Sequence, residues 1–116
     1  MFGMAVDSRP MPHAMLRILL ALAAGERHGY AIMQELKTDG LGGPLGTGTL
    51  YRAIQQLLDE GLIAESSGAA QESTDERRRY FRLSPAGRRA LGVETARLAH
   101  VLKRAAAIGI VTPGRR

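Results

Sequence analysis

The stretch GTLYRAIQQLLDEGLI, residues 48–63, has the apolar spacing of a helix that is buried on one side only. Its apolar residues at helical spacing are Leu50, Ile54, Leu57 and Leu58. The other side is polar and consists of Thr49, Arg52, Gln55, Gln56 and Asp59, with Gly48 and Tyr51 at its margin. We therefore predict an amphipathic helix from Thr49 to Glu60, ended by Gly61, whose polar side faces outward.

Two more helices are predicted before this one. The apolar run from His13 to Ala24 predicts the first, and the spacing of Ile32 and Leu36 places the second between about His28 and Lys37. The connector TDGLGGPLG then interrupts regular structure until a new helix starts near Thr47. Because the first helix is apolar on nearly every side and a small domain covers only one side of a helix, we expect a second subunit against it.

Two short strands are predicted after the third helix. Leu62–Glu65 and Arg79–Ser84 have strand-like composition, and a polar, glycine-containing loop joins them into a hairpin. Three short helices followed by a hairpin make up the winged form of the helix-turn-helix, in which the third helix fits the major groove of DNA. The predicted fold class is therefore mainly α with a small β-hairpin.

The C-terminal part of the chain predicts one long helix. Ser84 can cap its start, Pro85 suits its first position, and the helix then extends to about Ile108. Apolar residues that recur every seven positions form a short coiled-coil-like seam: Leu91, Leu98 and Ala105, and also Val101 and Ile108. A helix about 35 Å long, at roughly 1.5 Å per residue, exceeds what the preceding domain covers, so we expect it to pair across a two-fold axis.

These elements divide the chain into four parts. We expect a disordered or loosely ordered arm at residues 1–12, a winged-helix DNA-binding domain at 13–84, a dimerisation helix at 85–109 and a basic tail at 110–116. The residues predicted at the dimer interface are Leu16, Leu19, Leu20, Leu91, Leu98, Val101, Leu102 and Ala105.

The polar side of the third helix carries residue types that read bases. Arg52 can donate two hydrogen bonds to guanine, Gln55 can pair with adenine, and the methyl group of Thr49 can contact thymine. The glycine-rich start around Thr47 and Gly48 lets backbone N–H groups approach a phosphate. For this helix alone, an ordinary solvated surface explains the same residues.

Three consecutive arginines, Arg77, Arg78 and Arg79, lie where the loop enters the second strand. Because side chains alternate along a strand, at least one points to each side of the wing, and we predict contacts with phosphate or the minor groove. Acidic residues in the preceding segment 72–76 partly neutralise this run, so a solubilising charge run is the alternative.

The composition limits the classes of function that this chain can have. A net charge of +5 and a pI near 10.4 favour a polyanionic partner. The absence of cysteine excludes disulfides and thiolate chemistry. The opening residues MFGMAVDSRPMP lack the pattern of a secretory signal, and the longest apolar run is far below the roughly 20 residues that cross a bilayer. We expect a cytoplasmic protein without a membrane segment.

No catalytic or metal-binding pattern emerges from the sequence. His13, His28 and His100 are too scattered for metal-ligand spacing, and His28 suits a helix cap. No P-loop, dinucleotide-binding or Gly-x-Ser-x-Gly fingerprint occurs. We predict no metal, no cofactor and no enzyme activity.

Three motifs in order resemble the PadR family of transcriptional regulators. They are HGYAI at residues 28–32, GTLYRAIQQLLDEGLI at 48–63 and RRRYFRLSPAG at 77–87. The resemblance covers His13 to about Ile108, and the single C-terminal helix is similar to the shorter class of that family. It implies a homodimer, usually a repressor, that reads an inverted-repeat operator with the helix bearing TLY.

The resemblance also assigns roles to residues. It implies that Thr49, Tyr51 and Arg52 lie at the DNA, and that His28 and Tyr30 support the recognition helix or touch phosphate. Two features depart from the family pattern: Gly46-Thr47 stands where members often have Ser-Pro, and the wing tip GAAQESTDE is unusually acidic.

Other functions remain open at this point. A winged helix can serve as a protein-interaction module for an acidic partner, or belong to another regulator family such as the MarR type. Met15 and Met33 in apolar stripes are usually core residues, yet methionine also suits adaptable pockets. The family resemblance implies a small aromatic effector, for which we expect a dry cavity between the last helix and the first helix of the other subunit.

Overall fold

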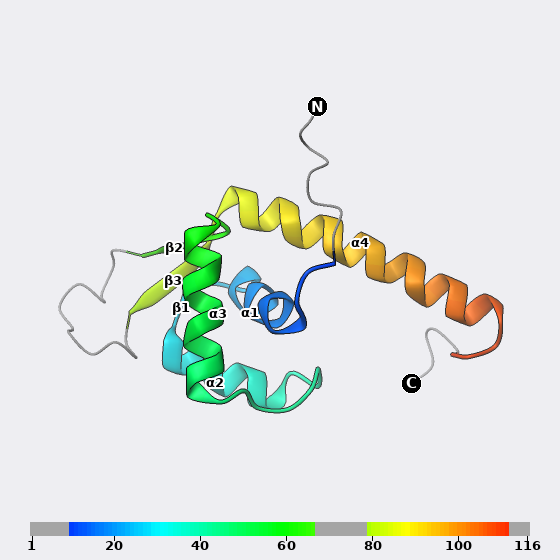
Figure 1. Ribbon diagram of the computed structural model, residues 1–116, viewed down its shortest axis with the longest axis horizontal. Coiled ribbons are helices and arrows are strands. Elements are labelled where there is room, and N and C mark those ends of the chain that lie inside the picture. The colour runs from blue at the N-terminus through cyan, green and yellow to red at the C-terminus, as the bar shows by residue number, and fades with distance from the viewer. Residues whose placement is uncertain (1–9, 67–78, 112–116) are drawn as a thin grey trace.

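The computed structural model describes residues 10–66 and 79–111, and its elements follow the predicted order (Figure 1). The helices are α1 (His13–Ala23), α2 (Gly29–Thr38), α3 (Thr47–Asp59) and α4 (Pro85–Ala107). The strands are β1 (Arg27–His28), β2 (Ile63–Glu65) and β3 (Tyr80–Leu83). The predicted fold class is confirmed, and the boundaries of each predicted helix differ from the observed ones by two residues at most.

The sheet contains one strand more than predicted. Its order is β1-β3-β2, and both outer strands run antiparallel to β3. In β1, Arg27 lies opposite Phe81 and His28 opposite Tyr80. A strand of two residues has no periodicity that a sequence pattern can show. It nevertheless fastens the start of α2 to the base of the hairpin.

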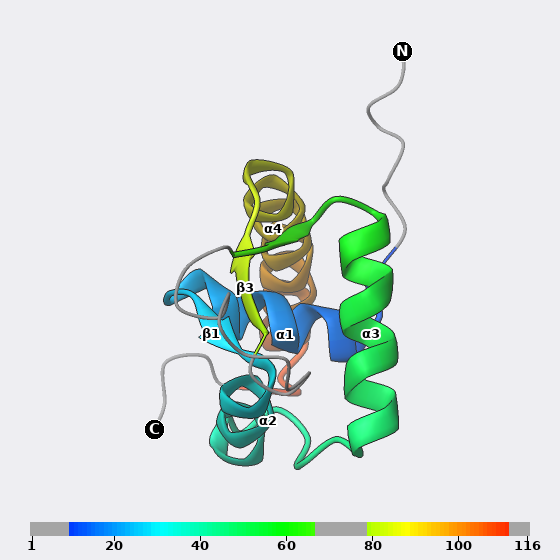
Figure 2. The ribbon, with the colours of Figure 1, turned by 90° about the vertical axis from the view of Figure 1, so that its left-hand side faces the viewer.

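Helix α1 lies at the centre of the domain and is covered by its own chain. It contacts α2, α3, α4 and β3, which surround it in Figure 2. Leu16 and Leu19 are buried in this core, as is Met15, whereas Leu20 stays partly exposed. The expectation that a second subunit must cover α1 was therefore wrong, because an all-round apolar helix can also be the central helix of one domain. For the same reason Leu16 and Leu19 have no surface to offer a partner.

Arg17 is the charged residue at this centre, with 3% of its surface exposed. Its Nη2 donates to the carbonyl oxygens of Leu36 at 2.8 Å and Gly43 at 2.6 Å. Its Nε and Nη2 each donate to one carboxylate oxygen of Asp39 at 3.0 Å. Asp39 in turn accepts the Leu41 N–H at 2.8 Å. The connector between α2 and α3 is thus tied to α1, which fixes the place where α3 begins.

Helix α4 begins as predicted and then leaves the domain. The hydroxyl oxygen of Ser84 accepts the Gly87 N–H at 3.0 Å, and Leu91 packs in the core. The second half of α4 extends past the rest of the domain (Figure 1). No helix in the described part of the chain is both long and apolar enough to cross a membrane.

The segment before α1 is partly fastened to α4. The Met11 N–H donates to a carboxylate oxygen of the buried Glu94 at 3.2 Å, and Arg97 pairs with the same carboxylate at 2.6 Å. Hydrogen bonding of this carboxylate to Arg97 lowers the pKa of Glu94. Residues 1–9 and 112–116, most of the predicted arm and tail, lie outside the described residues. Met11 itself is held by its hydrogen bond to Glu94.

We predict that Arg17→Met lowers the free energy of unfolding by about 3–5 kcal/mol, because it leaves Asp39 and two carbonyls without their cation. Arg89→Met, which removes an exposed arginine of α4, is the matched control and should change stability by about 0.5 kcal/mol or less. Urea denaturation followed by circular dichroism measures both. Equal effects of the two substitutions would contradict the assigned role of Arg17.

The same ion pair predicts a pH dependence. The hydrogen bond from Arg17 lowers the pKa of Asp39 below its ordinary value of 3.8. A carboxyl group whose pKa is lower in the folded state stabilises the fold above its unfolded pKa, and this contribution is lost as the pH falls through the folded pKa. We expect wild type to exceed Asp39→Asn in stability at pH 7, and this excess to shrink below pH 3.8. A pH series of urea titrations tests it; a constant difference would argue against the pair.

Candidate nucleic-acid interface

Helix α3 presents its polar side to solvent, as the sequence predicted. Leu50, Ile54 and Leu57 on its other side are buried in the core. The exposed residues of α3 are Thr47, Gly48, Thr49, Arg52, Gln55, Gln56 and Asp59. Their exposure follows from the amphipathic spacing, because burying the apolar stripe turns the opposite side outward. No described segment of the same chain covers this surface.

The start of α3 is open to an anionic group. Its N-cap is Gly46, which has no side chain to accept the first N–H groups, and the space around Gly46 and Gly48 is empty. The first N–H groups of a helix lack partners within the helix and carry the positive end of its dipole. The N-terminal turn of α3 therefore suits a phosphate oxygen.

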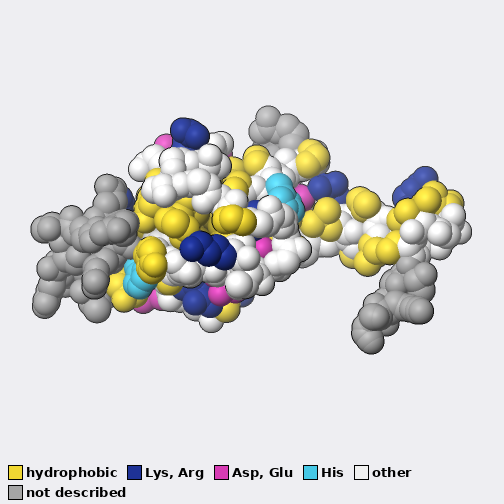
Figure 3. Space-filling model, turned by 90° about the horizontal axis from the view of Figure 1, so that it is seen from below, with side chains coloured by type: hydrophobic (Ala, Val, Ile, Leu, Met, Phe, Trp, Pro, Cys, Tyr) yellow, Lys and Arg dark blue, Asp and Glu magenta, His cyan; other side chains and the backbone are white. Residues whose placement is uncertain are grey.

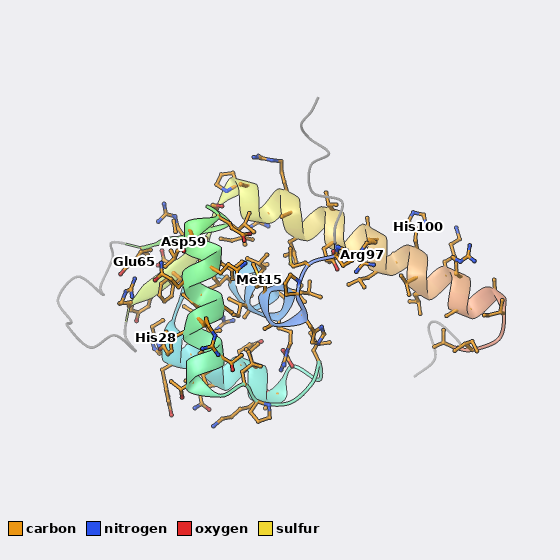
Figure 4. The ribbon with its side chains drawn as sticks, in the orientation of Figure 1. Met15, His28, Asp59, Glu65, Arg97 and His100 are labelled. Atoms are coloured by element: carbon orange, nitrogen blue, oxygen red, sulfur yellow. The ribbon has the colours of Figure 1, made fainter. Side chains whose placement is uncertain are left out.

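The C-terminal half of α3 is less suited to DNA than the sequence suggested. The side-chain amide of Gln55 donates to Asp59 at 3.0 Å, and that of Gln56 donates to Glu60 at 3.0 Å. Asp59 lies at the end of α3 that leads to β2 (Figure 4). One N–H of the Gln55 amide is engaged in this way, which leaves its second N–H and its amide oxygen for a new partner. Arg52 is the only cationic residue of α3, and the charge of Asp59 in the same helix balances it.

The HGY motif lies at the start of α2, beside the sheet. His28 is its N-cap, and its Nδ1 accepts the Ala31 N–H at 3.0 Å. The rings of His28 and Tyr80 lie nearly perpendicular, with their centroids 5.2 Å apart. The His28 ring also stacks with Tyr30, at a centroid distance of 6.4 Å. Tyr30 is 47% exposed. These contacts fit a supporting role for His28 and leave Tyr30 accessible.

Tyr51 faces inward rather than toward a groove. The residue is half-buried and its hydroxyl oxygen is fully buried, against Gly29 at the start of α2. This burial argues against a base contact by the Tyr51 hydroxyl, because an enclosed hydroxyl cannot reach a base edge without moving the ring.

At the base of the wing, Arg79 is engaged in an ion pair. It donates to the two carboxylate oxygens of Glu65 at 2.7 and 2.8 Å, and its guanidinium lies 5.4 Å from the centre of the Phe81 ring. Hydrogen bonding to Arg79 lowers the pKa of Glu65. A contact of Arg79 with phosphate would compete with this pair. Arg77 and Arg78 lie outside the described residues.

Comparison with known proteins identifies the family. The profile described as "Transcriptional regulator PadR-like family" matches residues 18–93 of the chain. The chain belongs to the PadR-like family of transcriptional regulators. No curated protein matches it.

Solved structures of PadR-like proteins share the fold of this chain. A PadR family transcription regulator from Clostridium difficile is 22% identical, with a TM-score of 0.70, over 84% of this chain and 98% of that one. A PadR-like transcription factor from Bacteroides fragilis is 23% identical, with a TM-score of 0.67, over 82% of this chain and 88% of that one. Bacillus subtilis PadR in complex with operator DNA is 26% identical, with a TM-score of 0.59, over 72% of this chain and 46% of that one.

In this PadR-like chain, apolar side chains remain exposed along the protruding half of α4. We call Leu98, Val101, Leu102 and Ala105, together with the C-cap residue Ile108, the α4 stripe; the spacing of the four helical residues places them on one side of α4. Leu98, Val101 and Leu102 are 36%, 52% and 45% exposed. Figure 3 shows apolar side chains along this part of the molecule. Leu91, also predicted at the interface, is buried in the core of its own domain instead.

The described residues contain no group of three or more histidine, aspartate or glutamate side chains placed to hold a metal ion. His28 and His100 lie on different elements, far apart along the molecule (Figure 4). Met15, considered for a ligand pocket, fills the core of its own domain.

Proposed function

We propose that this chain is a sequence-specific DNA-binding regulator that represses transcription as a homodimer on an inverted-repeat operator. The observation that carries the proposal is the exposed N-terminal half of α3, where an uncapped helix start lies directly before Thr49 and Arg52. Phosphate and base contacts are then available one helical turn apart. Membership of the PadR-like family supports the same role.

Each residue of this half has a distinct task in the proposal. The N–H groups of Thr47, Gly48 and Thr49 bind a phosphate and set the depth of α3 in the major groove. Arg52 donates two hydrogen bonds to a guanine. Gln55 contributes its amide oxygen, which accepts from the exocyclic amino group of adenine or cytosine. Arg77 and Arg78 of the wing contact the backbone or the minor groove.

The solved complex of Bacillus subtilis PadR with operator DNA supports the choice of a duplex as partner. A repressor that binds duplex DNA acts in the cytoplasm, so we propose this location for the chain. Because the chain belongs to the PadR-like family, it is not a regulator of the MarR type. A protein-interaction role is the remaining alternative, and the binding experiment below separates it.

Dimerisation through the α4 stripe completes the proposal. An exposed apolar row on a helix that extends past its domain is stabilised when a second copy covers it. Leu20 of α1 is the further apolar side chain that such a copy would reach. A two-fold axis between the α4 helices presents two α3 helices in opposite directions, which matches an inverted repeat. An aromatic effector would bind between α4 and α1 of the partner copy and release the operator by altering this arrangement.

We predict that Arg52→Ala weakens operator binding by about 1–3 kcal/mol and relaxes base preference at one position in each half-site. Arg52→Lys keeps the charge but loses the bidentate geometry, so it should lose base preference while the salt dependence of binding stays near that of wild type. Electrophoretic mobility shift titrations at several salt concentrations, with operator variants, measure both effects.

Lys103→Ala is the matched control, since this exposed cation lies in the half of α4 that is remote from α3 (Figure 1). It should leave base preference unchanged. Unaltered preference in Arg52→Ala would refute the assigned reading residue. If no genomic fragment binds wild type at low salt, the DNA-binding proposal fails and the protein-interaction role takes its place.

We predict that Leu98→Asp converts the dimer into monomers, because it buries a charge in the paired α4 stripe. Val93→Asp is the matched control: Val93 is 61% exposed on the same helix but lies about 140° around it from Leu98, at roughly 100° per residue. Sedimentation equilibrium should give twice the 12.5 kDa chain mass for wild type and Val93→Asp, and the chain mass for Leu98→Asp. An unchanged dimer in Leu98→Asp would place the interface elsewhere.

A further inference from the structure

Gly29 is the point where three elements of the domain meet. It is the buried first residue of α2. Its N–H donates to the carbonyl oxygen of Arg79, at the base of the wing, at 3.2 Å. On the other side, the ring of Tyr51 from α3 packs directly against its α-carbon. One small residue therefore touches both elements that the proposed function assigns to DNA.

The absence of a side chain at this position has a steric cause. The backbone of Gly29 is not in the left-handed region, so its conformation would accept any L-residue. A Cβ built on Gly29 would, however, overlap the hydroxyl oxygen of Tyr51 and lie 2.9 Å from its Cζ and 3.0 Å from its Cε1. Glycine costs about 0.5–1 kcal/mol in a helix relative to alanine. The space is thus occupied by Tyr51, and a methyl group has no room there.

We propose that the Gly29–Tyr51 contact sets the distance between the recognition helix and the wing, and that operator discrimination depends on it. The inference rests on the proposed function, since it concerns how α3 is presented to DNA. Tyr51 is a positioning residue in this role, because its hydroxyl is buried and acts on DNA only through the helix that carries it.

The physical link to specificity runs through neighbouring residues. Tyr51 directly precedes Arg52 on α3, so a displacement of its ring shifts the reading side of the helix. The wing base cannot follow freely, since the Gly29 N–H bond and the packing of His28 with Tyr80 hold the HGY turn on β3. A bidentate base contact requires defined geometry, whereas phosphate contacts tolerate adjustment. Displacing α3 should therefore reduce specific binding more than non-specific binding.

The test is a double-mutant cycle with Gly29→Ala, Tyr51→Phe and the combined variant. The measured quantity is the ratio of affinities for the operator and for an unrelated duplex of equal length, at one salt concentration. We expect Gly29→Ala to lower this ratio about tenfold or more, the scale of one lost bidentate contact. The combined variant should recover much of the loss, because removal of the hydroxyl opens the space that the new methyl group needs.

Gly92→Ala is the matched control, since a Cβ on this exposed α4 glycine meets nothing within 4 Å. It should leave the ratio unchanged. Circular dichroism and thermal unfolding establish that each variant is folded at the assay temperature. If Gly29→Ala alone does not fold, Tyr51→Phe is compared with the combined variant, where the new Cβ still crowds the ring carbons and should lower the ratio.

The possible results separate this inference from the function on which it rests. An operator ratio that stays at the wild-type value in a folded Gly29→Ala overturns the positioning role. Where Gly29→Ala does not fold, a combined variant with the same ratio as Tyr51→Phe overturns it. A combined variant that binds more weakly than Gly29→Ala by the full effect of Tyr51→Phe overturns it too, because additive effects show that the two residues act independently. If wild type itself does not distinguish the operator from other duplexes, the proposed function has failed first.

Discussion

The arrangement of the domain depends on satisfying the buried guanidinium of Arg17. A charge in the core is tolerated only when it is paired and its N–H groups find acceptors. Here the acceptors are Asp39 and the carbonyls of Leu36 and Gly43, all at the end of α2 or in the connector that leads to α3. The glycine-rich connector has little intrinsic order of its own. Arg17 of α1 therefore helps to fix where α3 begins, while the buried apolar side of α3 packs on α1 directly.

This central position of α1 also determines which apolar side chains stay exposed. Since α2, α3, α4 and β3 surround α1 and bury Met15–Leu19, Ala21 and Leu22, a single chain provides its own core. Most of the large apolar side chains that remain exposed lie on the second half of α4 and in the residues 108–111 that follow it. Folding and the proposed dimerisation thus use separate surfaces, and the proposed dimer can rearrange about α4 without loss of the winged-helix core.

Periodicity predicted the elements of the fold well but not the roles of individual side chains. The amphipathic spacing of α3 and the Ser84-Pro85 start of α4 depend on neighbours within one or two turns, so the sequence contains them. The partners of Arg17 lie 19 to 26 residues away, and β1 exists only because β3 pairs with it. In the candidate site, the Gln55–Asp59 pair was visible at a spacing of four residues. The burial of Tyr51 was not, because it depends on the packing of α2 against α3.

The distribution of charge indicates how such a site achieves specificity. Helix α4 (Pro85–Ala107) contains five basic residues and one acidic residue, whereas α3 contains one of each. The net charge of +5 therefore does not describe the reading surface, and it says more about long-range attraction to a polyanion than about recognition. With Arg52 as the single cation of α3, strong phosphate attraction cannot compensate for a misplaced helix. In the proposed function, discrimination then comes from the placement of a few groups, so contacts behind α3, such as Gly29 with Tyr51, matter as much as the residues on its exposed side.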